Sequence, residues 1–221
     1  MGLVLSCFFV LMPRVDFSLY LITDRHQTAG RPLLSVLERA LSAGVKAVQL
    51  REKDLGTRPL LELAAELLSL TRKHGGLLFI NDRVDLVMAL GADGVHLRSD
   101  SMPVQAARRV LGPNRLIGMS AHSVGEVLKA EADGADFAVL GPIYDTPSKR
   151  RYGNPIGLRP LEEVSQQSHI PIFAIGGISL PCVQEVRRAG AYGVALISAI
   201  LLSEDIEPAT RLLLHALQTS D

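Results

Sequence analysis

The chain has 221 residues, of which 48% are hydrophobic, enough apolar material for one large domain. Its 23 Lys and Arg residues balance its 23 Asp and Glu residues, so no bulk charge favours nucleic acid or an anionic membrane as a partner. Trp is absent and aromatic residues are few, which argues against base-stacking platforms. The two cysteines, Cys7 and Cys182, lack metal-binding or redox spacing and indicate a reducing, cytoplasmic setting.

Residues 3–12 are almost entirely apolar (LVLSCFFVLM). Such a run is too short to cross a bilayer. It has neither a basic residue before it nor a small-residue cleavage site after it, as a signal peptide would. We therefore expect no membrane partner and interpret residues 1–12 as an apolar N-terminal extension or a misassigned start. Residues 13–221 are predicted to form one domain.

In the first half of the chain, short apolar runs that suit buried strands alternate with helical patterns. Pro32 suits the first turn of a helix and Gly44 its end. The longest amphipathic helix ends before Gly75 and Gly76. The predicted strands cover residues 19–23, 47–50, 77–80 and 94–97, and the predicted helices cover residues 32–43, 58–73, 84–90 and 103–111.

The second half continues the alternation but contains one long predicted loop. Residues 141–157 are rich in Gly, Pro and polar side chains, and a loop of this length inside a compact domain is often functional. The predicted strands here cover residues 116–119, 137–140, 172–175 and 194–197, and the predicted helices cover residues 124–133, 182–189 and 209–217.

One short sequence motif recurs at every second predicted strand, at residues 44–50, 91–97, 134–140 and 190–196. Each copy begins with the glycine expected just past a helix end and continues into a buried strand. Alternating helices and strands indicate a parallel sheet, and eight strands predict a closed (β/α)8 TIM barrel. A doubly wound open sheet is the alternative, although no dinucleotide-binding glycine fingerprint follows the first strand. Function is expected at the carboxyl ends of the strands.

The second predicted strand leads into Gln49, Arg51 and Lys53, which share a face while the chain stays extended. An amide and two cations on one face suit a multiply charged anion, because Arg can donate to two phosphate oxygens and Lys adds a point charge. The alternative is a solvated charge cluster in which Glu52 and Asp54 balance the two cations.

Polar residues also follow the third and fourth predicted strands. Asn81 and Asp82 could hold Mg²⁺, which prefers oxygen ligands, or could cap the next helix. Asp100 is either a second metal carboxylate or a solvated side chain. His96, on an apolar strand, is interpreted as a core histidine whose hydrogen bonds are satisfied.

The fifth predicted strand ends at Ser120 and His122. A histidine at the catalytic end of a barrel is a plausible acid or base, since its ordinary pKa lies near neutrality. A residue at the start of the next helix is the competing interpretation. No catalytic triad can be inferred from this spacing.

The last strands are followed by candidate phosphate ligands. Thr146, Ser148 and Lys149 lie in the long loop and could close over a phosphorylated substrate, or could belong to a basic surface loop. Gly177 and Ser198 follow the seventh and eighth strands, where barrels commonly hold phosphate through backbone N–H groups.

These motifs, taken in order, resemble the thiamine phosphate synthase and TenI-like superfamily. The resemblance covers roughly residues 19–215, and its eight motifs together are far more specific than any one of them. They are residues 49–54, 80–85, 91–97, 120–123, 141–144, 146–149, 174–178 and 197–200.

The resemblance implies a transferase that joins hydroxymethylpyrimidine diphosphate to thiazole phosphate and releases pyrophosphate, with Mg²⁺ as cofactor. It makes Arg51, Lys53 and Lys149 the catalytic cations, which stabilise charge on the leaving diphosphate. The implied diphosphate and pyrimidine contacts are Gln49, Arg51, Lys53, Asn81, Ser120 and Lys149. The implied thiazole phosphate contacts are Thr146, Ser148, Gly177, Ile197 and Ser198.

One departure from the family pattern concerns the metal. Asp82 matches the first metal carboxylate, but Ser101 stands at the second position, and Asp100 precedes it by one residue. The tautomerase branch of the superfamily moves a proton on a thiazole carboxylate phosphate and would use His122, so it is the alternative activity. A non-catalytic phosphate-ligand binder or regulator on the same barrel is a third. Family members are often oligomers, which allows a homo-oligomer, although no residue here identifies an interface.

Overall fold

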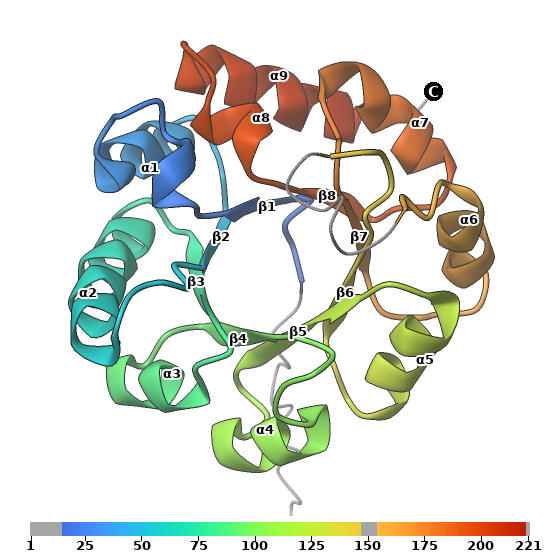
Figure 1. Cartoon of the computed structure of the whole chain (residues 1–221), viewed down its shortest axis with the longest axis horizontal. Coiled ribbons are helices and arrows are strands. Elements are labelled where there is room, and N and C mark those ends of the chain that lie inside the picture. Colours follow the sequence, from blue (N-terminus) through green and yellow to red (C-terminus); the bar gives the residue numbers. More distant parts are fainter. Residues whose placement is uncertain (1–14, 147–153, 220–221) are drawn as a thin grey trace, which may run out of the picture.

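The computed structural model describes residues 15–146 and 154–219, and its strands form one closed parallel barrel in the order β1 to β8 (Figure 1). The barrel closes where Leu19 pairs with Val194, which excludes the open sheet and confirms the predicted TIM barrel. The strands are β1 (Leu19–Ile22), β2 (Ala47–Leu50), β3 (Leu77–Asn81), β4 (Gly94–Leu97), β5 (Leu116–Ala121), β6 (Phe137–Leu140), β7 (Ile172–Ile175) and β8 (Gly193–Leu196).

Helices surround the barrel on its outside (Figure 1). No helix in the described part of the chain is long and apolar enough to cross a bilayer. The helices are η1 (Arg25–Gln27), α1 (Leu33–Ser42), α2 (Thr57–Lys73), α3 (Val84–Leu90), α4 (Val104–Leu111), α5 (Val124–Ala132), α6 (Arg159–Ser165), η3 (Leu180–Cys182), α7 (Val183–Arg188), α8 (Ser198–Leu201) and α9 (Ile206–Gln218).

Two α-helices, α6 and α8, and the two short 3-10 helices, η1 and η3, were not predicted. The seven residues of α6 bury only Leu161 and Val164, too few positions to show a helical period. The four residues of α8 make a single turn. The last helix also begins at Ile206 rather than at residue 209, because Pro208 is tolerated within a first turn, where its missing N–H has no intrahelical partner.

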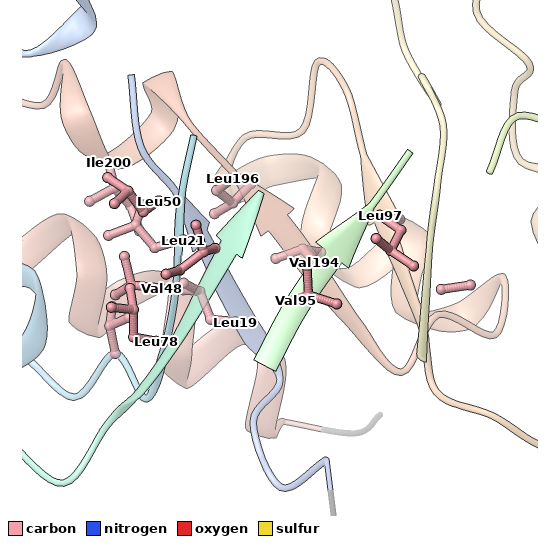
Figure 2. Close-up of a cluster of buried hydrophobic side chains, with 14 of the residues drawn as sticks. Leu19, Leu21, Val48, Leu50, Leu78, Val95, Leu97, Val194, Leu196 and Ile200 are labelled. Carbon is pink, nitrogen blue, oxygen red and sulfur yellow. The ribbon is translucent and has the colours of Figure 1, made fainter. Parts of the chain in front are cut away.

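Two hydrophobic layers hold the barrel together. Side chains alternate along each strand, so that Leu19 and Leu21 of β1 face the helices whereas Tyr20 and Ile22 face the interior. Figure 2 shows part of the outer layer, which includes Val48, Leu50, Leu78, Val95, Leu97, Val194, Leu196 and Ile200.

The interior layer is aromatic. Four of the six Phe residues of the chain lie in it beside Tyr20, with neighbouring ring centroids 5.2–6.1 Å apart. Glycines on adjacent strands make room for these rings. A Cβ atom at Gly118 would lie 2.3 Å from Phe137, and one at Gly94 would lie 2.7 Å from Phe79. The aromatic layer fills the barrel below the carboxyl ends of the strands and forms the floor beneath them.

Candidate functional site

The carboxyl ends of the eight parallel strands form one rim, and the described site residues predicted from the sequence lie on it. Gln49 and Ser120 belong to β2 and β5, and Asn81 is the last residue of β3. Ser148 and Lys149 lie outside the described residues. The others lie one to six residues beyond the ends of their strands: Arg51, Lys53, Asp82, His122, Thr146, Gly177, Ile197 and Ser198.

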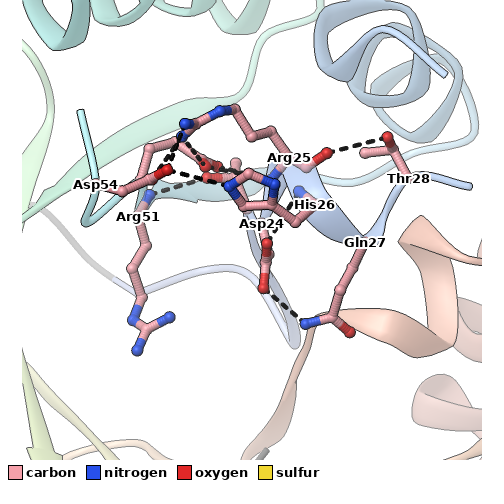
Figure 3. A network of polar contacts seen from close by, with 9 residues as sticks. Asp24, Arg25, His26, Gln27, Thr28, Arg51 and Asp54 are labelled. Atoms are coloured by element: carbon pink, nitrogen blue, oxygen red, sulfur yellow. Dashed lines mark hydrogen bonds and ion pairs between the residues drawn. The ribbon is translucent and has the colours of Figure 1, made fainter. Parts of the chain in front are cut away.

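A polar network beside β1 holds the loop that carries Arg51 and Lys53 (Figure 3). The Arg25 guanidinium donates to both Asp54 carboxylate oxygens, at 2.6 and 2.5 Å, and to Glu52 at 3.2 Å. The Arg25 backbone N–H also donates to Glu52. Arg25 therefore fixes both carboxylates of the loop.

This network bears on the alternative in which Glu52 and Asp54 merely balance the neighbouring cations. The hydrogen bond from Arg25, and a further contact of 3.1 Å with His26 Nε2, hold the pKa of Asp54 well below its ordinary value. Figure 3 shows the Arg51 guanidinium pointing away from Arg25 and Asp54. The acidic side chains of the loop are thus engaged by Arg25 and His26 of η1, the short helix after β1. No role was predicted for Arg25, although its place shortly after a strand was visible.

Asp82 occupies a special backbone position after β3. Its φ of +60° lies in the left-handed region, which Asp adopts more readily than most residues. Residues with such backbone angles are found most often at functional sites. Asp82, Asn81 and Lys53 line a cavity of about 370 Å³ at the ends of β2, β3 and β4. The helix-cap interpretation is not supported, because Arg83 is the N-cap of α3 and no side chain caps it.

The neighbour of Asp82 across this cavity is Arg98, the first residue after β4. Arg98 Nε lies 2.7 Å from Asp82 Oδ2, and Arg98 Nη2 lies 3.1 Å from Asp100 Oδ1. The two candidate metal carboxylates therefore share one cation, the Arg98 guanidinium. Arg98 was not among the predicted site residues, because the positions of Asp82, Arg98 and Asp100 along the chain do not show that one guanidinium contacts both carboxylates.

The carboxylates of Asp82 and Asp100 meet part of what a Mg²⁺ site requires. Within the described ranges, no three His, Cys, Asp or Glu side chains form a group that could hold a metal. Mg²⁺ in phosphate-handling sites, however, is usually held by one or two carboxylates together with waters and substrate phosphates. Asp82 with Asp100 meets that lesser requirement, because both already face the same positive charge.

Buried polar side chains link the floor of the site to the rim. His96 is buried, as predicted for a core histidine. Its Nε2 lies 2.9 Å from Ser120 Oγ and its Nδ1 lies 3.5 Å from Tyr20 Oη. Gln49 Nε2 donates to Tyr20 Oη at 3.2 Å. Two predicted substrate residues, Gln49 and Ser120, are therefore joined through Tyr20 and His96.

His122, the candidate acid or base, is exposed at the end of β5. Its Nδ1 lies 3.3 Å from Glu126 Oε2, and its backbone N–H donates to the same oxygen at 2.8 Å. Glu126 lies in the first turn of α5, where Ser123 caps the helix. His122 thus takes part in the start of a helix, which agrees with the simpler of its two interpretations.

The glycines after β7 meet the loop after β6. A Cβ atom at Gly176 would lie 2.6 Å from Pro142, and one at Gly177 would lie 2.7 Å from the carbonyl oxygen of Asp145. Tyr144 N–H also donates to the Gly176 carbonyl at 3.0 Å. Close packing against this loop therefore requires glycine at both positions, and it brings Gly177 beside the segment that carries Thr146.

A second cavity, of about 410 Å³, lies at the opposite end of the barrel. Ser18, Gly44 and His215 are among its lining residues, and none of the predicted site residues is. Its place at the amino ends of the strands separates it from the rim, so the rim remains the candidate site.

The fold and the rim place the protein in the class of (β/α)8-barrel enzymes. A family model described as thiamine monophosphate synthase matches residues 19–200. The chain belongs to this family, as the resemblance of its motifs predicted.

Individual relatives support the same assignment. A putative thiamine-phosphate synthase of Geobacter sulfurreducens is 54% identical over 206 residues, covering 93% of this chain and 97% of the relative. The thiamine-phosphate synthase of Chloroflexus aurantiacus is 46% identical over 197 residues, covering 89% and 91%. The solved thiamine phosphate pyrophosphorylase from Pyrococcus furiosus has a TM-score of 0.83 and 37% identity, covering 91% of this chain and 96% of that one.

Proposed function

We propose that the protein is a thiamine-phosphate synthase, a transferase that condenses hydroxymethylpyrimidine diphosphate with thiazole phosphate. One observation carries the proposal beyond family membership. Arg51 and Lys53 stand on the same rim as Gly177 and Ser198, while Arg25 engages the acidic neighbours of the two cations. This arrangement supports separate places for a diphosphate and a monophosphate at one end of the barrel.

In the proposed reaction, the bond between the pyrimidine methylene carbon and the diphosphate oxygen breaks, and the diphosphate keeps the electron pair. The thiazole nitrogen then supplies its lone pair to that carbon, so that thiamine phosphate and pyrophosphate are the products. Arg51 and Lys53, with Lys149 from outside the described residues, stabilise the negative charge that grows on the leaving group. Holding both substrates on one rim removes much of the entropic barrier.

The pyrimidine and its diphosphate are proposed to contact Gln49, Asn81 and Ser120 besides these cations. The thiazole phosphate is proposed to contact Thr146, Ser148, Gly177, Ile197 and Ser198. Gly177 lies close against the carbonyl oxygen of Asp145, next to Thr146, and this proximity supports a shared phosphate site.

Mg²⁺ is the proposed cofactor, and Asp82 with Asp100 would hold it; Ser101, at the position of the family's second carboxylate, is the weaker candidate. When bound, the ion supplies positive charge next to the diphosphate. Asp82 is the essential ligand of this proposal, because it faces the cavity that Lys53 and Asn81 also line.

Small phosphorylated molecules are the proposed partners, and the cytoplasm is the proposed location. The tautomerase alternative would use His122, whose Nδ1 contacts Glu126 at 3.3 Å; this contact fits either activity. The synthase names of the relatives favour the first activity over a tautomerase or a non-catalytic binder.

An assay with both substrates and Mg²⁺ tests the proposal, with thiamine phosphate and pyrophosphate measured as products. The unchanged protein should form both products in equal amounts, and Asp82→Ala should lose Mg²⁺-dependent turnover. Asp85→Ala is a matched control, because Asp85 pairs with Arg83 on the exposed start of α3. Aromatisation of the thiazole carboxylate isomer without thiamine phosphate would show a tautomerase, and ligand binding without either product would show a binder.

A further inference from the structure

A chain of hydrogen bonds crosses the barrel interior from β2 to β5. It runs from Gln49 through Tyr20 and His96 to Ser120, with separations of 3.2, 3.5 and 2.9 Å. Gln49, Tyr20 and His96 are buried, whereas Ser120 is half-buried and reaches the rim. The two ends belong to the proposed pyrimidine site, but the mechanism above uses neither Tyr20 nor His96.

Both middle side chains are buried, and among the described residues the His96 ring bonds only to two hydroxyl groups and to no carboxylate, which favours neutral rings at physiological pH. Burial, with the nearby positive charge of Arg51, also lowers the pKa of His96 to about 3. Burial also raises the pKa of Tyr20 well above its ordinary value. A neutral imidazole has one N–H donor and one acceptor nitrogen, so the chain of hydrogen bonds must have a direction.

The contacts of Tyr20 determine that direction. Its oxygen accepts from the Gln49 amide, and its only other side-chain partner among the described residues is His96 Nδ1. The Tyr20 hydroxyl hydrogen must therefore go to Nδ1, because the reverse arrangement would leave a buried hydroxyl without an acceptor, which proteins avoid. The His96 proton then resides on Nε2 and is donated to Ser120 Oγ.

We infer that Tyr20 and His96 are positioning residues that fix the hydrogen-bond direction of the pyrimidine site. Because Ser120 accepts from His96, its own O–H is left to donate to the ligand. Because Gln49 donates inward, its carbonyl oxygen is left as an acceptor. Ser120 and Gln49 therefore suit a ring that has an acceptor nitrogen beside an exocyclic amine better than a ring in which an oxo group adjoins a ring N–H. The identity of this ligand rests on the proposed function.

Packing keeps the two rings in place. The Tyr20 ring meets Phe79 and Phe137 edge-on, with centroids 5.3 and 5.4 Å apart. His96 pairs in register with Gly118, where an added Cβ atom would lie 2.8 Å from His96 Nδ1. Neither ring can rotate freely, so the positions of Tyr20 Oη and of both His96 nitrogens are fixed by the barrel.

Nitrogen-15 NMR of histidine-labelled protein tests the direction without any substrate. The His96 signals, assigned by their loss in His96→Gln, should show a proton on Nε2 and none on Nδ1 from pH 5 to pH 8. Arg51, the charged group that depresses the His96 pKa, stays positive throughout this range. A proton on Nδ1, or an imidazolium at pH 7, would overturn the inference whether or not the protein makes thiamine phosphate.

Steady-state kinetics test the consequence for the ligand. Tyr20→Phe and His96→Leu should each raise KM for the pyrimidine diphosphate about tenfold, the loss expected for one hydrogen bond. They should leave KM for thiazole phosphate unchanged, and Tyr20→Phe should weaken rejection of the oxo analogue. His96→Gln should recover part of the loss, because its amide N–H can replace Nε2–H.

Equal rises of both KM values in folded variants, or no change in either, would contradict a positioning role. Folding of each variant is checked by its thermal unfolding midpoint. A lack of synthase turnover in the unchanged protein would remove the proposed ligand, and the NMR result would still decide the direction of the hydrogen bonds.

Discussion

At the residue scale, Arg98 changes how the metal position is understood. The family pattern would place a second carboxylate at residue 101, and this chain has Ser101 there. Arg98 bridges Asp82 and Asp100 instead, at 2.7 and 3.1 Å. A divalent cation must compete with this guanidinium for the same carboxylates, since both favour the same negative potential.

We predict that Arg98→Gln tightens the binding of Mn²⁺, used as a spectroscopic substitute for Mg²⁺, by about tenfold, or ~1.4 kcal/mol. Removing the guanidinium frees Asp82 and removes a nearby positive charge. Electron paramagnetic resonance titration without substrate measures the change. Arg83→Gln is the matched control, because Arg83 lines the same cavity but pairs with Asp85. Unchanged or weaker Mn²⁺ binding in Arg98→Gln would show that Arg98 does not compete with the metal.

At the element scale, the loop between β2 and α2 owes its shape to the segment after β1. Arg25 and His26 of η1 hold Asp54, and Thr23 Oγ1 accepts from the backbone N–H of Arg51 at 2.9 Å. The position of the two proposed catalytic cations therefore depends on contacts between residues about 28 positions apart. A change in η1 should act on the proposed diphosphate site without touching a ligand.

The pH dependence of stability tests the contact between Asp54 and Arg25. The folded-state pKa of Asp54 is depressed, so its contribution is present above its unfolded pKa of about 3.9 and is lost as pH falls toward the folded value. Asp54→Asn should therefore lower the thermal unfolding midpoint at pH 7 and have a shrinking effect below about pH 3.9. An effect that is equally large at pH 7 and at pH 2.5 would exclude this ion pair as its cause.

At the scale of the whole molecule, the closed barrel depends on pairing rings with glycines in its interior. Phe79, Phe137 and Phe173 each lie against a glycine of a neighbouring strand. Because interiors are close-packed, an extra methyl group at such a place must displace a ring or a strand.

We predict that Gly118→Ala lowers the free energy of unfolding by roughly 1–3 kcal/mol, since its Cβ atom would overlap the Phe137 ring. Gly125→Ala in α5 is the matched control. Its Cβ atom would meet nothing within 4 Å, and Ala is the better helix former by about 1 kcal/mol. Urea unfolding followed by circular dichroism measures both. Equal stability of the Gly118→Ala protein would mean that the interior has space to spare.

Much of the fold could be predicted because its signals are local. One helix-to-strand sequence motif is repeated at residues 44–50, 91–97, 134–140 and 190–196. The corresponding strands β2, β4, β6 and β8 lie where they were predicted. The helix α8 could not be predicted, because its four residues make a single turn. The helix α6 directly follows the long loop at residues 141–157 and buries only Leu161 and Val164, so no apolar pattern separates it from the loop. The division into residues 1–12 and one domain from residue 13 stays a prediction.

The site was predicted only in part, for a different reason. Position near the carboxyl end of a strand was enough to select Gln49, Asp82 and Ser120 as candidates. Arg25 and Arg98 were missed, because their importance comes from the partners they meet across the rim. His96 was correctly expected to be buried, but its link to Ser120 was not foreseen.

By itself, the amino-acid sequence determined the alternation of strands and helices, the family, and which residues follow each strand. These are properties of neighbouring residues and of their order along the chain. Only the tertiary structure decided that Arg98 stands between two carboxylates and that Tyr20 and His96 join Gln49 to Ser120. Closing the barrel brings side chains from strands far apart in the sequence within hydrogen-bonding distance. The number of residues between two positions does not determine their separation in space.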